Sequence, residues 1–280
     1  MARKLLLNAS YAELTVENVL TPAQTAKLKD EYLDNTYATF PPITASTLAL
    51  DQQDRVVFLY LRNVLRRAFY EQAWEAVQKM KFNDAKRSRR NALKKSGGRE
   101  LNFGWADRPH RLRLPKRILE LAPSGYKRQH NIDSYAPTRH QWAKYQELIP
   151  LIDNMDRWFY RYLPDAWTTT NYRGKLRSYQ YLRATGRSSF STLTLLKSAP
   201  TSVHRDSNNA DAGLTCLTTF GEFDGGDLLF PQYGIKVVVK PGDLIIAATH
   251  REWHCNVRPL TGTRYALIGY FREGLINGRH

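Results

Sequence analysis

From about Lys175 onward, the chain consists of short β-forming runs separated by turn residues, and this pattern constrains the fold more than any other feature. Glycine, proline and aspartate separate the runs, as at Asp224-Gly225-Gly226 and Pro241-Gly242. So many short strands at close spacing predict a sandwich or barrel of the jelly-roll kind. The expected strands are Leu176–Leu182, Phe190–Leu196, Thr201–Asp206, Gly213–Phe220, Asp227–Phe230, Ile235–Val239, Asp243–Ala248, Cys255–Arg258 and Arg264–Phe271.

The first half of the chain has a different pattern, and we expect it to be mainly helical. Asp51–Met80 and Arg139–Leu163 carry apolar residues at spacings of three or four, which is typical of a helix with one buried face. Pro150 should kink or divide the second helix. A shorter helix, Pro22–Asp34, is expected to begin after Thr21 as its N-cap.

These patterns predict an α+β chain in one integrated domain. Residues 1–174 would form a helical region with a basic loop at 86–116, and this region would buttress a β core formed by residues 175–280. With 42% hydrophobic and 12% aromatic residues in 280, a substantial core can form. Cys216 and Cys255 are too few for a disulfide framework, which fits a reducing compartment. No apolar run reaches the length of a signal peptide or a membrane span. We expect an intracellular monomer, nuclear in a eukaryote, with no membrane partner.

The net charge of +16 favours a polyanionic partner. Residues 86–99 hold seven positive charges and no acidic residue, so we expect this stretch to contact nucleic acid. A solvated loop and a nuclear-import signal are the alternatives. The seven candidate contact residues are Lys86, Arg87, Arg89, Arg90, Lys94, Lys95 and Arg99.

Two histidines and an aspartate predict a metal site. On a strand, His204 and Asp206 lie on the same face, so an imidazole and a carboxylate can converge on one ion. Either His250 or His254 could be the third ligand; His254 fits better because it opens a short strand. Two imidazoles and one carboxylate suit a non-haem Fe(II) with open positions for a cosubstrate and O₂. An isolated His-x-Asp is common, and taken alone it indicates only a surface pair.

Arg264 begins a strongly strand-forming run, ten residues after His254. A buried arginine needs a partner because an unpaired buried charge is costly. An internal salt bridge is one solution. The other is the carboxylate of a dicarboxylate cosubstrate, held by the planar guanidinium. Together with the metal ligands, this arginine predicts an oxygenase that uses 2-oxoglutarate.

Residues 175–275 resemble the catalytic core of the Tet/JBP-type nucleic-acid dioxygenases. The resemblance rests on Phe-Ser-x-x-Thr at 190–194, His-Arg-Asp-x-x-Asn at 204–209, the Gly225-Gly226 pair and the Pro-x-Tyr-Gly turn at 231–234. It implies a double-stranded β-helix, with Fe(II) held by His204, Asp206 and His254. It also implies that Arg264 binds 2-oxoglutarate, and that O₂ is the second cosubstrate.

The same resemblance implies a pocket for a flipped-out base. Asn209 matches a position that hydrogen-bonds the base, and Tyr270 matches an aromatic residue that stacks on it. Arg272 stands where Tet enzymes usually have a histidine, and arginine offers only donors. Ala266 and Ile268 share the strand face of these residues and would line the pocket.

The implied activity is hydroxylation of a methyl group on a base in double-stranded, methylated DNA, with 5-methylcytosine the first expectation. Thymine and N6-methyladenine are alternative bases. A protein or small-molecule hydroxylase of the prolyl-hydroxylase type is an alternative enzyme class. The remaining alternative is a metal-free β-sandwich that only binds nucleic acid.

Overall fold

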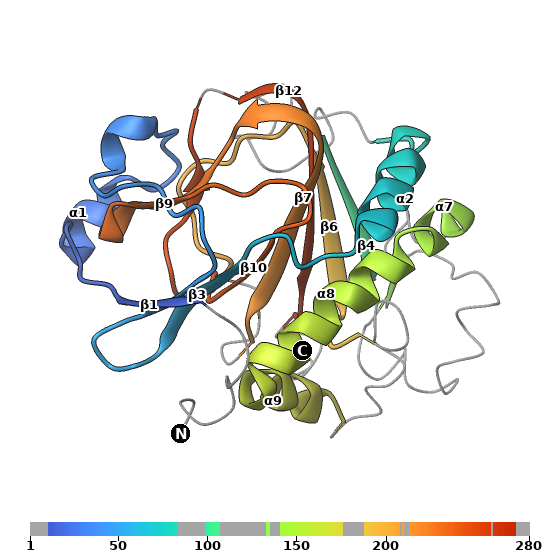
Figure 1. Ribbon diagram of the computed structural model, residues 1–280, viewed down its shortest axis with the longest axis horizontal. Coiled ribbons are helices and arrows are strands. Elements are labelled where there is room, and N and C mark those ends of the chain that lie inside the picture. Colours follow the sequence, from blue (N-terminus) through green and yellow to red (C-terminus); the bar gives the residue numbers. More distant parts are fainter. Residues whose placement is uncertain are drawn as a thin grey trace.

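The computed structural model describes residues 11–82, 99–106, 133–134, 141–175, 188–207, 209, 213–258 and 260–272. Two β-sheets face each other, and a group of helices lies along one side of the molecule (Figure 1). The strands are β1 (Ala12–Thr15), β2 (Thr47–Leu50), β3 (Val56–Leu61), β4 (Arg99–Ala106), β5 (Asp133–Ser134), β6 (Thr192–Lys197), β7 (Thr215–Gly225), β8 (Leu228–Phe230), β9 (Ile235–Val237), β10 (Leu244–Ala247), β11 (Cys255–Asn256) and β12 (Leu260–Tyr270). Within the described residues, the larger sheet runs β1-β2-β3-β10-β7-β12-β6-β4-β5 and the smaller β11-β8-β9.

The helices are α1 (Pro22–Lys27), α2 (Arg67–Gln78), α7 (Trp142–Gln146), α8 (Ile149–Tyr162) and α9 (Pro164–Lys175), with 3₁₀ turns η2 (Asn35–Tyr37) and η5 (Pro231–Tyr233). Thr21 caps α1 as predicted, in a reciprocal capping box with Gln24. Pro150 is the second residue of α8 and separates it from α7, which confirms the predicted division. None of the helices in the described ranges is long and apolar enough to cross a bilayer.

The prediction of a mainly helical first half is not confirmed. Asp51–Met80 is helical only over α2; its first part forms β3, which pairs antiparallel with β10 in the large sheet. The physical reason is the uninterrupted apolar run Val56–Leu61, which suits a strand buried on both faces. The Asp54 backbone, with φ 56°, turns the chain just before it. β1, β2 and β4 also join the large sheet, so the described part of the first half is mixed α and β.

Two other expected elements differ from the structure: one helix is shorter than predicted, and one strand does not form. The helix expected over Pro22–Asp34 ends at Lys27. Thr201–Asp206 is not a strand: among its residues only His204 forms a bridge, to His254. Leu176–Leu182 lies outside the described residues, and the boundary near residue 175 stays a prediction. A strand overlaps each of the other seven runs that were expected to be strands, and β7 and β12 extend beyond the expected bounds, to Gly225 and back to Leu260.

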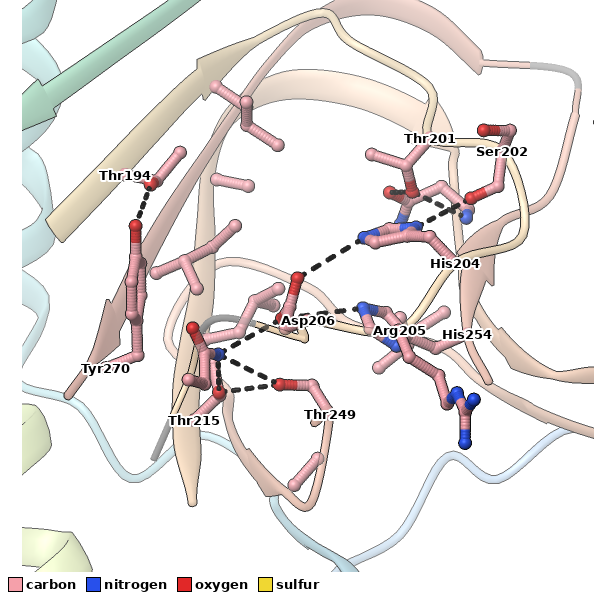
Figure 2. A pocket seen from close by; sticks show the side chains of 18 of the residues that line it. Thr194, Thr201, Ser202, His204, Arg205, Asp206, Thr215, Thr249, His254 and Tyr270 are labelled. Atoms are coloured by element: carbon pink, nitrogen blue, oxygen red, sulfur yellow. Dashed lines mark hydrogen bonds and ion pairs between the residues drawn. The ribbon is translucent and has the colours of Figure 1, made fainter. Parts of the chain in front are cut away.

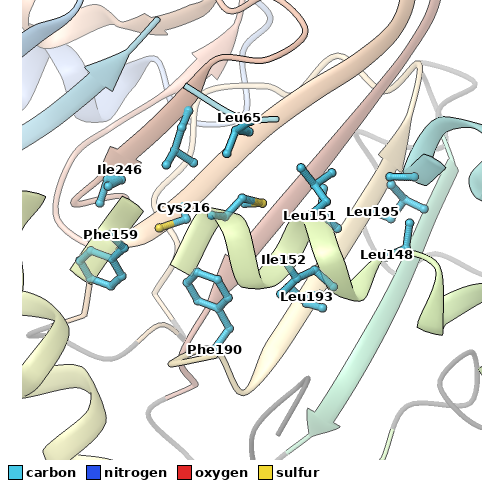
Figure 3. Close-up of a cluster of buried hydrophobic side chains, with 14 of the residues drawn as sticks. Leu65, Leu148, Leu151, Ile152, Phe159, Phe190, Leu193, Leu195, Cys216 and Ile246 are labelled. Atoms are coloured by element: carbon cyan, nitrogen blue, oxygen red, sulfur yellow. The ribbon is translucent and has the colours of Figure 1, made fainter. Parts of the chain in front are cut away.

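Alternation along the central strands divides the core into two layers. Leu193, Cys216 and Ile246 point to one face of the large sheet and pack against α8 and its neighbouring helices (Figure 3). Leu267 of β12 belongs to the same cluster. The next residue in each of these strands points to the opposite face, toward the small sheet. There, Phe58 stacks on Phe230 of β8 at a centroid distance of 5.1 Å. The large sheet is therefore buried on both faces, and the space between the sheets is available for a site.

Candidate active site

His204, Asp206 and His254 come together in a pocket lined by residues of both sheets (Figure 2). His204 and His254 form a bridge in which each backbone N–H donates to the other's carbonyl at 3.0 Å. Asp206 faces both rings, with Oδ1 3.6 Å from His204 Nε2 and Oδ2 3.9 Å from His254 Nε2. One ligand atom of each residue lies within 4.8 Å of the others, so all three can bind one ion. His250 does not belong to this group.

Backbone carbonyls orient both imidazoles toward the aspartate. The Nδ1 of His204 lies 2.7 Å from the Ser202 carbonyl, and that of His254 lies 3.1 Å from the Glu252 carbonyl. When each Nδ1 donates to its carbonyl, the lone pair is on Nε2, where a metal would bind. The Glu252 side chain is itself held by the Tyr233 hydroxyl, which donates to it at 2.8 Å. The donor set and its orientation therefore fit a divalent metal.

A polar network fixes the aspartate as well. The Asn209 amide donates to Asp206 Oδ2 at 3.3 Å and to Thr215 Oγ1 at 3.1 Å. The Thr215 and Thr249 hydroxyls lie 2.6 Å apart and are buried. The backbone N–H of Asp206 donates to the Thr249 carbonyl at 2.9 Å. Asn209 therefore contacts the carboxylate of the candidate metal-ligand group, in addition to lining the pocket.

Arg264 presents a buried charge with free donors. Its side chain lines the pocket, the residue is 2% exposed, and its Nε and Nη2 have no hydrogen-bond partner within the described structure. Burial lowers the pKa of Arg264 to about 10, and the Asp227 carboxylate opposes this only in part. Gly226, with φ 70°, makes room: a Cβ there would lie 3.3 Å from Arg264 Cδ. Such a guanidinium needs an anion, and a carboxylate matches its planar donors.

β12 supplies one wall of the pocket, which has a volume of about 750 Å³. Arg264, Ala266, Ile268 and Tyr270 lie on the same face of this strand and line the cavity, as does Arg272 just beyond it. The alternate residues of the strand enter the core under the helices. This volume falls within the range of small-molecule sites.

The remaining pocket residues that we predicted have polar neighbours. The Tyr270 hydroxyl lies 3.2 Å from Thr194 Oγ1 (Figure 2). Arg272 is 7% exposed, and its backbone N–H donates to Ser191 Oγ at 3.1 Å. Its backbone also bridges that of Asn209, which joins two of the expected base contacts.

The sequence reasoning missed several pocket residues. Thr194 and Thr215 share a strand face with other lining residues, so alternation along β6 and β7 could have identified them. Asp30, Glu31 and Tyr32 form another wall, and no sequence signal pointed to them. The basic residues Lys86, Arg87, Arg89, Arg90, Lys94 and Lys95 lie outside the described residues, and Arg99 begins β4.

Two facing sheets that enclose a two-histidine, one-carboxylate group and a buried arginine define a non-haem Fe(II) oxygenase that uses 2-oxoglutarate. Comparison with known proteins leads to the family. The Tet_JBP family model, described as the oxygenase domain of the 2OGFeDO superfamily, matches residues 125–273. That is just over half of the chain, and the chain belongs to this family. It therefore carries an oxygenase domain of this superfamily, whose cofactor and cosubstrates are Fe(II), 2-oxoglutarate and O₂.

Individual relatives share limited identity with the chain. It is 29% identical over 115 residues to thymine dioxygenase JBP1 of Leishmania tarentolae, and the matched region covers 41% of this chain and 13% of the relative. Thymine dioxygenase JBP1-A of Trypanosoma cruzi is 27% identical over 143 residues, and this match covers 49% of this chain and 16% of the relative. The chain thus spans less than a fifth of the length of these relatives. The solved structure of NgTET1 in complex with 5mC DNA has a TM-score of 0.57 and 16% identity, covering 96% of this chain and 85% of that one. This likeness supports the shared fold.

Proposed function

We propose that this chain oxidises the methyl group of a flipped-out base in DNA. The observation that carries the proposal is the unpaired Arg264 guanidinium in the pocket of the metal-ligand group. In this proposal His204, Asp206 and His254 hold Fe(II), and Arg264 binds the far carboxylate of 2-oxoglutarate. When bound, the iron, 2-oxoglutarate and O₂ supply an oxidant strong enough to take hydrogen from a methyl group.

The residues of the chain bind, orient and shield these reactants. The Ser202 and Glu252 carbonyls keep the Nε2 atoms of the histidines directed at the metal, and the Asn209 amide restrains Asp206. The apolar wall that includes Ala266 and Ile268 excludes water from the reacting methyl group. Precise placement of the methyl group, rather than proton transfer by a side chain, is the contribution expected of the protein here.

A base must leave the helix to reach this pocket, because a methyl group inside a duplex is out of reach of a buried metal. In our proposal, Tyr270 stacks on the flipped base, and Asn209 and Arg272 contact its polar edge. All three residues line the same cavity as the metal ligands. Asn209 reaches both the carboxylate of Asp206 and the cavity, so it would couple base binding to the metal site.

We place 5-methylcytosine first among the substrates, and thymine is the second candidate. NgTET1 was solved with 5mC DNA, and the relatives in the two trypanosomatids are named thymine dioxygenases. One observation favours thymine: Arg272 lines the pocket and offers only donors. Thymine presents a carbonyl acceptor at the position where cytosine presents an amino donor.

The proposed DNA partner also accounts for the net charge of +16, because phosphate contacts from lysine and arginine position a duplex without reading its sequence. We include the basic stretch 86–99 in this contact. The protein would act as a monomer inside the cell, and in the nucleus of a eukaryote.

The test is incubation of the full chain with Fe(II), 2-oxoglutarate, O₂ and one of three duplexes. The first carries 5-methylcytosine, the second carries N6-methyladenine, and the third has thymine as its one methyl-bearing base. Nucleosides are then analysed by mass spectrometry, and succinate is measured in the same tubes. We expect a hydroxymethyl pyrimidine and one succinate for each hydroxylation, and no product from Asp206→Ala. Turnover of a proline-containing peptide, with every duplex left unmodified, would instead identify a protein hydroxylase.

A further inference from the structure

Two exposed arginines near the metal-ligand group each lie over the ring of an aromatic side chain. Arg205 Cζ is 4.5 Å from the Trp253 ring centroid, and Arg258 Cζ is 4.0 Å from that of Tyr32. Both arginines are exposed, whereas both rings are half-buried. Within the described structure, neither guanidinium makes a hydrogen bond or an ion pair. Their N–H groups are therefore free to bind an external anion.

Tyr32 is held in place by a segment docked on the small sheet. Val203 exchanges backbone hydrogen bonds of 2.8 and 2.9 Å with residues 30–31, and the N–H of Arg258 donates to the Leu33 carbonyl at 3.1 Å. Leu33 is 4% exposed and packs in the apolar cluster that contains Val203. The segment thus fixes the Tyr32 ring in the pocket wall with Arg258 over it.

Arg205 and its partner lie directly next to metal ligands. Arg205 stands between His204 and Asp206, and its side chain extends away from that of Asp206 (Figure 2). Trp253 precedes His254 and packs against the same apolar cluster as Leu33. Both arginine–aromatic pairs therefore border one small cluster beside the pocket, and both have a member that lines the pocket.

Stacking on an aromatic face holds a guanidinium still and leaves its in-plane donors available. Those donors match the oxygens of a phosphate in a bidentate arrangement. The carboxylate of 2-oxoglutarate already has a buried partner in Arg264, whereas these two groups are exposed. An anion that binds them must belong to a molecule that remains partly outside the pocket.

We propose that Arg205 and Arg258 form a phosphate clamp that holds the DNA backbone beside the flipped nucleotide. This inference rests on the proposed function, since it takes DNA as the substrate. It assigns phosphate contacts to the described part of the chain, at the pocket itself, independently of the basic stretch 86–99.

The same wall carries two exposed carboxylates, Asp30 and Glu31. A phosphate held by the clamp would be repelled by them, because like charges near one site oppose each other. Neutralising Glu31 should therefore have the opposite effect to neutralising either arginine. A general effect of net charge would give the same two signs. The test therefore needs a control arginine far from the pocket, whose loss should leave binding unchanged.

The experiment measures binding of a fluorescein-labelled duplex with one 5-methylcytosine to the full chain loaded with Mn(II) and 2-oxoglutarate. Anisotropy titrations at several salt concentrations give the Kd and its salt slope for Arg205→Gln, Arg258→Gln, Glu31→Gln and the control Arg67→Gln. Arg67 is exposed on α2, where it pairs with Glu71. We expect each clamp variant to bind about fivefold more weakly and the salt slope to fall by about 1. Glu31→Gln should bind more tightly, and Arg67→Gln should bind like the wild type.

A further variant tests the role of stacking. Tyr32→Leu keeps the charge of Arg258 but removes its aromatic partner, so we expect weaker binding with an unchanged salt slope. Mn(II) and 2-oxoglutarate affinities are measured for every variant. If Arg205→Gln changes them, because Arg205 lies between His204 and Asp206, the phosphate clamp is judged on Arg258→Gln alone. Wild-type affinity and slope in Arg258→Gln, in an enzyme that still oxidises DNA, would overturn the clamp and leave the proposed function standing. A wild-type chain that neither binds nor oxidises DNA would overturn both.

Discussion

The clearest consequence of the site is that Arg264 should lower the stability of the protein when 2-oxoglutarate is absent. Burial lowers its pKa to about 10, more than two powers of ten below the ordinary value for arginine, which corresponds to about 3 kcal/mol. Below pH 10 the group is charged in both the folded and the unfolded protein, so this cost is fully present at neutral pH. Stability should rise only as the pH increases above about 10, where the folded protein loses the proton first.

Arg264→Met removes the charge and keeps most of the side-chain volume. After allowing for lost packing, we expect the variant without ligand to be more stable by about 2 kcal/mol, which raises Tm by about 5 °C. The wild type should gain about 2.7 kcal/mol from 2-oxoglutarate at one hundred times its Kd. The variant should gain almost nothing, because the partner of the far carboxylate is gone.

Thermal unfolding of the Mn(II)-loaded protein, with and without 2-oxoglutarate, measures both effects. Arg264→Lys is the matched control: it retains a charge but not the planar pair of donors, so its response to 2-oxoglutarate should be intermediate. The reasoning would be refuted if Arg264→Met were less stable than the wild type and the wild type did not respond to 2-oxoglutarate. The guanidinium would then be satisfied within the protein.

Two substitutions in the site and one labelling experiment on the core give three further tests. Gly226→Ala places a Cβ 3.3 Å from Arg264 Cδ at a φ of 70°, so we expect the KM for 2-oxoglutarate to rise about tenfold while Mn(II) binding stays unchanged; an unaltered KM would contradict this. Asn209→Leu removes the amide that restrains Asp206 and should weaken Mn(II) affinity about tenfold by calorimetry; wild-type affinity would remove Asn209 from that role. Burial raises the pKa of the Cys255 thiol to about 12, so this residue should react with a disulfide reagent at pH 8 only after unfolding; rapid labelling of the native protein would contradict its burial.

The strand-rich half could be predicted because its signals are local. Alternation of side chains and glycine turns specify short strands without reference to the rest of the chain. Their spacing predicted that His204 and Asp206 share one site, although the strand assumed around them does not form. The strand-forming run after Arg264 predicted its strand, and Arg264 is the fifth residue of the longer β12. The close approach of His204 and Asp206 to His254 depends on a single backbone bridge, which no local pattern encodes.

The first half was harder to predict for a physical reason. Val56–Leu61 is apolar on both faces because β3 lies inside the large sheet between two buried layers, and a short apolar run fits a strand or a buried helix equally well. The pocket wall at residues 30–32 was also missed. It depends on backbone hydrogen bonds to Val203, more than 170 residues away, and main-chain pairing of this kind carries no residue preference.

The shared face of β12 has a consequence for how the substrate range of such an enzyme can change. The expected anchor for the cosubstrate, Arg264, and the expected base contact, Tyr270, lie six residues apart on one strand, about 20 Å along it. Because the rise per residue of a strand is fixed, β12 sets the distance between the binding positions of the two ligands. Inserting or deleting one residue would turn one end of it away from the cavity, whereas single substitutions at Ala266 or Ile268 would reshape the space between. New substrates should therefore arise in this family by replacement of pocket-facing residues of this strand, with the number of residues between the two binding positions preserved.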